Sequence, residues 1–213
     1  YLTCPLILQR LKRDLALISS NQSEEFSEVN NDELAHDSIY VISDSEEDGR
    51  KTAIARGDKA VFHEFAFTAQ KQDSARSIAD LLSKLIFPDK PEYEEWKKQF
   101  HSRFAIVSDN VFKDFSGMAT EVITRNKIDD DTGVVSEIGG LWTEELLPSE
   151  TVFYSVFLAA KPFRANPILK DASEVIEFIK GQLNDKRVQI GGDRSVGRGI
   201  MVAHFLPQEV KNG

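Results

Sequence analysis

The sequence predicts an α+β fold, because segments with strand-like and helix-like apolar spacing alternate along its 213 residues. In the first half, helical periodicity over residues 74–87 lies between strand-like runs at residues 59–68 and 104–107. In the second half, a strand-like run, a helix and further strand-like runs follow one another over residues 151–206. This closing β-α-β order favours a ferredoxin-like sandwich, and the length is typical of a single domain over residues 1–213.

Each element of the first half has its own local signal. Pro5 suits the first turn of a helix, and the leucines that follow it recur at helical spacing. Pro88 ends the second helical stretch, and Ser108 is placed to cap a further helical turn through Val111. The predicted elements are helices over residues 5–18, 74–87 and 92–100, and strands over residues 59–68 and 104–107.

The second half begins with a predicted hairpin. An Asp-rich turn that ends at Gly133 separates a strand-like run from a return strand that starts at Val134. Further along, Asp171 is placed to cap a helix. The predicted elements are a projecting hairpin over residues 119–139, a strand over residues 151–160, a helix over residues 172–183, and strands over residues 188–190 and 200–205.

The net charge of −9 is concentrated in one stretch. Residues 19–49 hold ten acidic residues and no Lys or Arg, which leaves 26 basic and 25 acidic residues in the rest of the chain. We therefore predict an acidic, partly disordered surface insertion over residues 19–57 on a body of near-neutral charge. Because salt screens distant charges, a local basic surface is enough to hold a phosphodiester backbone. Such clusters occur at Arg10, Lys12 and Arg13, and at Lys186, Arg187, Arg194 and Arg198.

Several classes of protein are disfavoured by the composition. No apolar run approaches the ~18 residues that span a bilayer, and no basic-then-apolar leader is present, so the sequence predicts a cytoplasmic protein without a membrane partner. The lone Cys4 cannot form an internal disulfide or a thiolate metal site, which agrees with a reducing compartment. The chain starts at Tyr1 rather than Met, so we expect that an N-terminal portion is missing.

The most informative stretch is a loop between two apolar runs, over residues 191–199. Glycine has no Cβ and brings backbone N–H groups close to a ligand, while arginine offers forked donors that suit phosphate. The predicted anion-binding residues are Gly191, Gly192, Arg194, Gly197, Arg198 and Gly199. The spacing fits neither a P-loop nor a Rossmann turn. A glycine-rich hairpin loop without a ligand is an equal alternative from composition alone.

Charged side chains outside this loop supply a few further candidates. Glu144 and Glu145 could bind a divalent metal or move a proton, but neighbours in a strand face opposite sides, so at most one points into a given site. Arg125 and Lys127 share a strand face and could contact a nucleic-acid backbone, with ordinary exposed charges as the alternative. The aspartates at 129–131 predict a solvated turn, and the scattered histidines predict structural roles.

Six segments, taken in order, carry a family resemblance. They are residues 1–5, 64–67, 106–112, 119–125 and 141–151, and the glycine loop. Together they resemble the backbone subunit of the type III-B CRISPR effector, the Cmr complex, in the RAMP superfamily. The glycine loop marks the superfamily, and the segments Glu144-Glu145-Leu146-Leu147-Pro148 and Ile106-Val107-Ser108-Asp109 narrow the resemblance to this subunit. The backbone subunit of the type III-A effector is the nearest alternative.

The resemblance implies a RAMP domain with an RRM-like, ferredoxin-like core, a helical insertion and a thumb formed by the hairpin over residues 119–139. It implies a subunit that polymerises into a helical filament on guide CRISPR RNA, beside other Cmr subunits, in antiviral defence. The glycine loop, Arg125, Lys127 and Met118 are the RNA contacts that it implies. Apolar thumb residues, with Val122, Ile123 and Ile128 as candidates, would displace bases in the duplex of guide and target RNA.

The resemblance also implies an endoribonuclease that cleaves target RNA with a divalent metal such as Mg or Mn. In the family, an aspartate in an N-terminal loop carries this chemistry, and we expect this chain to begin after that loop. Glu144 or Glu145 matches a later acidic position tied to cleavage, whereas Leu146 stands where some relatives carry an aromatic residue. No metal ligand is assigned, and activity of this chain is left open.

Two other functions remain as alternatives. A metal-independent guide-processing RNase on a related fold also carries a glycine-rich loop, and would need a general acid or base near it. Only His204 and Lys186 are close to the loop in sequence. A non-catalytic assembly protein, whose loop packs on a neighbouring subunit, is the second alternative.

Overall fold

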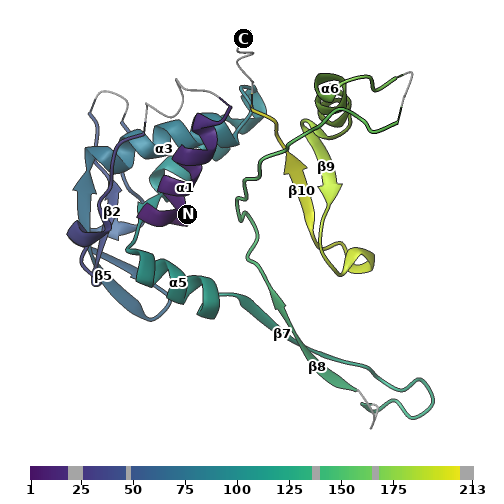
Figure 1. Ribbon diagram of the computed structural model, residues 1–213. Helices are drawn as coiled ribbons and strands as arrows, with labels where there is room; N and C mark the ends of the chain where they lie inside the picture. The colour runs from purple at the N-terminus through teal and green to yellow at the C-terminus, as the bar shows by residue number, and fades with distance from the viewer. Residues whose placement is uncertain (19–25, 47–48, 136–139, 165–167, 207–213) are drawn as a thin grey trace.

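The computed structural model describes residues 1–18, 26–46, 49–135, 140–164 and 168–206. Its main body is a mixed six-stranded sheet that contains β2 and β5 (Figure 1). The strand order is β1-β6-β2-β5-β4-β3. β1 runs parallel to β6 and β2 runs parallel to β5, while the other neighbours are antiparallel. The strands are β1 Leu2–Thr3, β2 Ser38–Ile42, β3 Ala55–Arg56, β4 Lys59–Phe62, β5 Phe65–Gln72 and β6 Ala105–Ile106.

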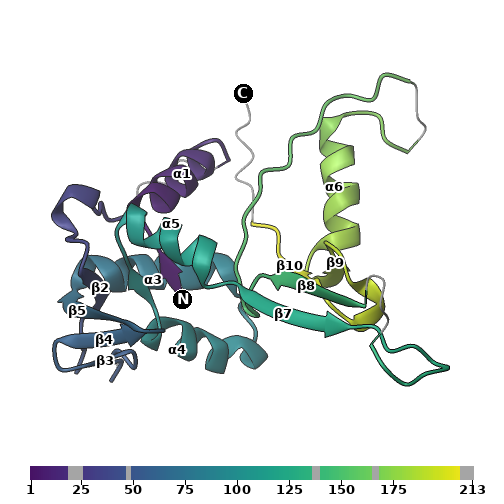
Figure 2. The same ribbon diagram turned by 90° about the horizontal axis from the view of Figure 1, so that it is seen from below.

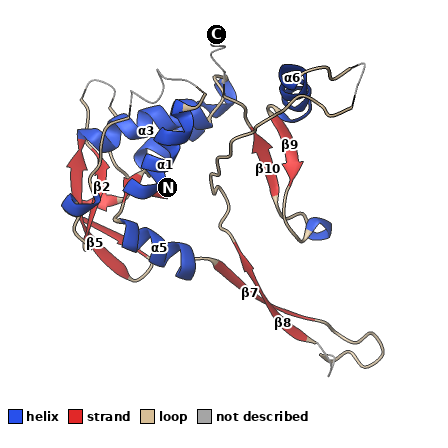
Figure 3. Cartoon of the chain, in the orientation of Figure 1, coloured by secondary structure: helices blue, strands red, loops and turns tan. Residues whose placement is uncertain are grey.

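Helices pack on this sheet through two hydrophobic clusters. They are α1 Pro5–Ala16, α3 Asp73–Ile86, α4 Glu94–Ser102 and α5 Asp109–Met118, with short 3-10 turns η1 Asn31–Glu33 and η2 Pro91–Tyr93 (Figure 3). β2 serves both clusters: Ile42 packs with α1, α3 and α4, whereas Ile39 and Val41 pack with β5 and α5. Alternate strand residues face opposite sides of a sheet, so the apolar run at residues 39–42 fits a strand covered on both faces.

The structure corrects the expectation of a surface insertion over residues 19–57. β2 lies inside the six-stranded sheet, and Ile39, Val41 and Ile42 are 0% exposed. Buried backbone must be hydrogen bonded, and the strand meets this need by pairing with both β5 and β6. The acidic residues on both sides of β2 led to the prediction of a surface segment, although β2 itself is apolar and buried. The expectation for residues 19–25 and 47–48 lies outside the described residues.

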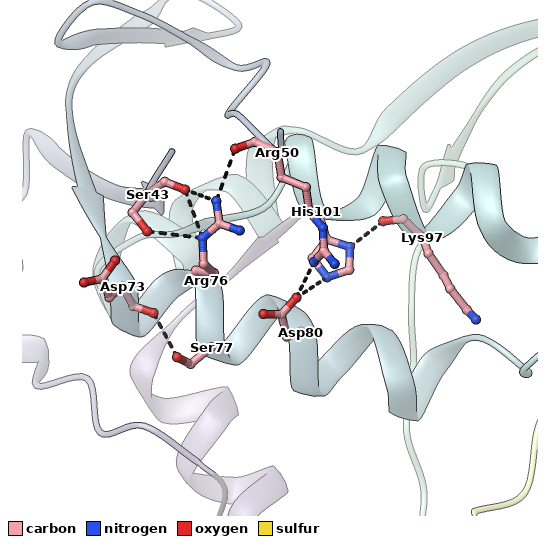
Figure 4. Close-up of polar contacts among 8 residues, drawn as sticks. All are labelled: Ser43, Arg50, Asp73, Arg76, Ser77, Asp80, Lys97 and His101. Carbon is pink, nitrogen blue, oxygen red and sulfur yellow. Dashed lines mark hydrogen bonds and ion pairs between the residues drawn. The ribbon is translucent and has the colours of Figure 1, made fainter. Parts of the chain in front are cut away.

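The chain after β2 is tied to α3 and α4 by a polar network (Figure 4). Arg76 donates to the Ser43 carbonyl and to the Ser43 hydroxyl, and also to the Arg50 carbonyl at 3.2 Å. Asp80 Oδ1 lies 2.6 Å from Arg50 Nη1 and 2.8 Å from His101 Nε2. Because His101 is buried and bonded within this network, the predicted structural role of this histidine fits its surroundings.

The segment predicted as one strand over residues 59–68 forms two. β4 and β5 pair as an antiparallel hairpin, with Phe62 opposite Phe65. His63 takes a left-handed conformation with φ 53°, which reverses the chain between them. Left-handed backbone is uncommon for residues other than glycine, and histidine adopts it only occasionally, so the residue type gave no strong turn signal here.

A second hairpin projects away from the main body after α5 (Figures 1 and 2). It consists of β7 Glu121–Asn126 and β8 Leu141–Leu146, paired from Glu121↔Leu146 to Asn126↔Leu141, and we call it the arm. The predicted β7 is present, but the return strand is β8 rather than the segment after Val134, which contributes only a bridge between Ile128 and Val135. The hairpin therefore extends beyond the range 119–139, of which residues 136–139 lie outside the described residues.

The last elements are α6 Ala172–Leu183, β9 Lys186–Gln189, the 3-10 turn η3 Arg194–Val196 and β10 Ile200–Ala203. The Asp171 side chain accepts a hydrogen bond of 2.9 Å from the Glu174 backbone N–H, which confirms the predicted cap. The strand expected at residues 151–160 is wrong, since the structure describes these residues without regular secondary structure. None of the described strands pairs with them, and β-propensity alone does not supply a partner.

The two halves differ in how they are packed. Among the described residues, every buried hydrophobic side chain lies between Cys4 and Val111. After α5, the chain contacts the main body at a few places, such as Lys90 with Asp185 at 3.0 Å and Leu206 against the first cluster. The sheet, helices and hairpins together confirm the predicted α+β class.

Candidate nucleic-acid interface

The glycine loop joins β9 to β10 as an ordered turn with its own hydrogen bonds. Ile190 N–H donates to the Gly199 carbonyl at 2.9 Å and closes the base of the loop. Inside it, the backbone N–H groups of Val196 and Arg198 donate to the Asp193 carbonyl, and that of Gly197 donates to the Arg194 carbonyl. These three N–H groups are therefore satisfied inside the loop.

Two glycines of the loop are required by its shape for different reasons. Gly197 has φ 79°, a left-handed conformation that closes η3. Gly199 has φ 68°, and a Cβ at this position would lie 2.1 Å from the Ile190 carbonyl oxygen. Gly199 thus allows two backbone segments of the loop base to approach closely, whereas the predicted approach of the loop glycines to an anion stays a prediction.

One face of the arm carries a small polar cluster. Arg125 lies opposite Trp142, and Ile123 lies opposite Glu144, so these side chains share a face of the hairpin. Glu144 is the centre of the cluster: its Oε2 lies 2.8 Å from Arg125 Nε, and its Oε1 accepts a hydrogen bond of 2.9 Å from Trp142 Nε1. The carboxylate of Glu144 therefore contacts both Arg125 and Trp142 on this face of the arm.

The same carboxylate also interacts electrostatically with the glycine loop. The hydrogen bond from Trp142 lowers the pKa of Glu144 below its usual value, partial burial opposes this, and the positive charge of Arg125 adds to the lowering. Asp193 and Arg198 of the glycine loop also lower the pKa of this carboxyl. Glu144 is therefore ionised at neutral pH and lies next to the loop.

The structure separates the other predicted residues from this cluster. Glu145 faces the opposite side of β8, where its Oε1 accepts a hydrogen bond of 2.6 Å from the Thr120 hydroxyl. Lys127 follows the end of β7 toward the tip of the arm, and its backbone N–H donates to the Gly140 carbonyl at 2.8 Å. Arg194 lies at the exposed end of the glycine loop. The predicted set thus divides into one group around Glu144 and several outlying residues.

Met118 lies beside a different hollow, of about 420 Å³, between α5 and the β4–β5 hairpin. The lining of this hollow combines aromatic rings with the carboxylates of Asp37, Glu64 and Asp114. No Lys or Arg is among the described lining residues to offset these carboxylates, so the hollow is not suited to an RNA backbone. Met118 stays a prediction as an RNA contact.

The described residues do not fit a divalent metal ion. Within residues 1–18, 26–46, 49–135, 140–164 and 168–206, no group of three or more His, Cys, Asp and Glu side chains is placed to hold a metal. Both oxygens of Glu144 are engaged by Arg125 and Trp142. A hard cation needs several convergent oxygen ligands, so we derive no catalytic step through a metal from these residues.

The acid and base candidates for a guide-processing RNase lie away from the glycine loop. Lys186 pairs with Ala203 at the end of the β9–β10 hairpin opposite to the loop. Lys186 Nζ donates to the Gly181 carbonyl at 2.5 Å, and His204 Nδ1 lies 2.7 Å from Asp185 Oδ1. Neither side chain is placed to act on a ligand at residues 191–199.

Sequence reasoning missed Trp142 and Asp193 as members of the site. Trp142 is two residues before Glu144 on the same strand, so alternation within a strand was the signal that could have grouped them. Asp193 had no such signal, because only the folded loop brings it to the arm.

In the part of the chain that the structure describes, no helix is long and apolar enough to cross a membrane.

Comparison with known proteins agrees with this architecture. The family model for the RAMP superfamily matches residues 22–202. A curated relative, the CRISPR system Cmr endoribonuclease Cmr4 of Pyrococcus furiosus, is 34% identical over 214 residues, covering 100% of this chain and 64% of the relative. The chain therefore spans just under two thirds of that relative's length.

Solved structures show the same fold. The crystal structure of oligomeric Cmr4 from Pyrococcus furiosus has a TM-score of 0.52 at 26% identity, covering 94% of this chain and 62% of that one. A chain in the cryo-EM structure of the type III-B Cmr-beta complex bound to cognate target RNA has a TM-score of 0.56 at 20% identity, covering 94% and 58%. With most of its length matched by the family model, and with its similarity to Cmr4, this chain belongs to the RAMP superfamily.

Proposed function

We propose that this chain is a backbone-type subunit of a type III-B CRISPR effector and holds guide RNA by its phosphates. The observation that carries the proposal is the cluster around Glu144, whose carboxylate lies 2.8 Å from Arg125 and is also acted on by the positive charge of Arg198 in the glycine loop. Similarity to Cmr4 supports the same conclusion.

The chemistry of this surface suits binding that is independent of base sequence. Arginine contacts phosphate through a planar fork of donors, and phosphate contacts position an RNA without reading its bases. Glu144 limits the motion of Arg125 and so reduces the entropy lost when the guanidinium binds. Guide pairing then supplies the specificity for target RNA.

The arm is proposed to act as the thumb of the subunit. Large apolar side chains are exposed along it, including Val122, Ile128 and Leu141. Exposed apolar side chains on a projecting hairpin suit insertion between stacked bases, as in proteins that wedge base steps apart. In this proposal the arm interrupts the duplex of guide and target RNA while the glycine loop keeps the guide backbone in place.

The proposed partners follow from the relatives. One similar structure is described as oligomeric, and another belongs to a complex bound to cognate target RNA. We propose that copies of this chain assemble side by side on the guide, together with other Cmr subunits.

Cleavage of target RNA is a separate proposal, supported by the name of the curated relative as an endoribonuclease. A role for Glu144 or Glu145 in cleavage stays a prediction. Single substitutions Glu144→Gln and Glu145→Gln in a full-length protein, assayed for Mg- or Mn-dependent target cleavage at saturating guide, test it. Cleavage at the unaltered rate in both variants would assign the two residues structural roles.

The binding proposal is tested by replacing both loop arginines, Arg194→Ala and Arg198→Ala, in the 213-residue chain. Each phosphate contact on a single strand contributes about 0.7 to the slope of log affinity against log salt, so the slope falls by about 1.4 and affinity falls about tenfold near 0.15 M salt. The readout is fluorescence anisotropy of a labelled single-stranded RNA across a salt series.

The matched control removes two exposed positive charges from the main body, Arg56→Ala and Lys98→Ala. This variant has the same net charge as the loop variant, so the two differ only in where the charge is lost. Equal RNA affinity and equal salt slope in both variants would contradict the proposal.

A further inference from the structure

We propose that Trp142 is a stacking platform for an unpaired RNA base, on the face of the arm that adjoins the glycine loop. The inference rests on the proposed RNA-binding function and adds a base contact to its phosphate contacts.

The indole of Trp142 is both accessible and held in place. Its side chain is 41% exposed, although β8 lies beside β7 and carries the Glu144 cluster. The Nε1–H group donates to Glu144 Oε1 at 2.9 Å, so rotation of the ring breaks a charge-assisted hydrogen bond. A ring that is fixed before binding loses little entropy when a base stacks on it.

The surroundings of the ring indicate nucleic acid. Arg125 lies directly across the hairpin from Trp142, and Lys127 follows immediately after the end of β7. Arg198 of the glycine loop acts on the carboxylate that holds the ring. An aromatic surface flanked by cations is the arrangement that single-strand binding proteins use, with stacking for the base and positive charge for the backbone.

This arrangement assigns a positioning role to Glu144. One oxygen of the carboxylate orients the indole, and the other orients the Arg125 guanidinium. Glu144 does not itself touch RNA in this proposal. Glu144→Gln keeps a carbonyl acceptor for the indole N–H, whereas Glu144→Ala removes it, so the conservative variant should retain most of the base contact.

The chain offers an internal control, because it contains only two tryptophans. Trp96 lies in α4 on the main body and is 42% exposed, which matches Trp142 in accessibility. In the Trp96→Phe variant, fluorescence reports Trp142 alone, and in the Trp142→Phe variant it reports Trp96 alone. Titration with a single-stranded oligouridylate should quench the first variant and leave the second unchanged.

Affinity measurements separate stacking from charge. Trp142→Ala should weaken binding of the oligouridylate about 30-fold, the middle of the range for loss of one base–aromatic stack, and leave the salt slope unchanged. An abasic oligonucleotide of the same length keeps the phosphates and lacks the bases. Wild type and Trp142→Ala should bind it equally.

The outcomes distinguish this inference from the proposed function. If RNA binds with the salt dependence expected for the loop arginines but does not quench the fluorescence of Trp142, the stacking role is overturned and the proposed RNA binding stands. No RNA binding by the wild-type chain overturns the proposed function itself. If Trp142→Ala lowers the affinity for the abasic oligonucleotide as much as the affinity for the oligouridylate, the substitution acts on the structure of the arm, and the inference is also overturned.

Discussion

Replacement of single glycines in the loop should give a graded loss of local stability. Gly199→Ala places a Cβ 2.1 Å from the Ile190 carbonyl oxygen, where ordinary contacts begin near 3.4 Å, so the backbone must shift by about 1.3 Å. The shift breaks the 2.9 Å bond from Ile190 N–H to the Gly199 carbonyl. Left-handed strain of about 1–2 kcal/mol and loss of a hydrogen bond of about 1 kcal/mol give about 2–3 kcal/mol in total.

Two other glycines supply the matched comparison. Gly197 has φ 79° and open space at its Cβ position, so Gly197→Ala pays the conformational strain alone, about 1–2 kcal/mol. At Gly192, φ lies outside the left-handed range and the Cβ position is also open. Gly192→Ala should be neutral or stabilising by up to about 1 kcal/mol, because alanine restricts the unfolded chain.

The assay must report the loop rather than the core, because the buried hydrophobic residues lie between Cys4 and Val111. Amide hydrogen exchange of Ile190, Val196 and Gly197 measures opening of the loop directly. Exchange should be fastest in Gly199→Ala, intermediate in Gly197→Ala and unchanged or slower in Gly192→Ala. Equal exchange in the Gly199 and Gly192 variants would refute the steric reasoning.

Two further predictions concern titratable groups. Hydrogen bonds from His204 and Lys90 lower the pKa of Asp185 below its ordinary value of 3.8. The contribution of Asp185 to folding stability is therefore complete above pH 3.8 and is lost as the pH falls through the lower pKa of the folded state. Asp185→Asn keeps a residue that tolerates φ 54°, so denaturation curves of the two proteins should differ at neutral pH and converge in strong acid; a constant difference would contradict this. Burial raises the pKa of the Cys4 thiol to about 11. A disulfide reagent at pH 8 should therefore label Cys4 slowly in the folded protein and rapidly in denaturant. Fast labelling of the native chain would show that the thiol is not buried.

Local signals in the sequence predicted the helices well. The capping role of Asp171 depends only on residues three positions away, and the same is true of Ser108, whose hydroxyl accepts from Val111 N–H at 3.4 Å. Helical apolar spacing located α1 and α3 because burial on one side of a helix is a property of a continuous segment. These features form from neighbours in sequence.

The strands were less predictable, because a strand is defined by its partner. Val134 follows the turn at once and suggested the return strand, yet β7 pairs with β8 further along. Residues 151–160 have strong β-propensity and no described partner strand, so propensity did not become a strand. The identities of Glu144, Arg125 and Arg198 as candidates were predictable, but their convergence required the register of the arm and the position of the loop.

The placement of all buried hydrophobic side chains of the described chain before residue 112 has a consequence for how such a protein can change over generations. Most substitutions in a buried core cost stability, typically about 0.5–3 kcal/mol, and so are removed whatever they do for the ligand. The arm and the glycine loop lie outside that core, so their side chains can be exchanged with little penalty to the six-stranded sheet. The side chains proposed to contact RNA can therefore change, and with them the affinity for RNA, while the six-stranded sheet and its helices are conserved.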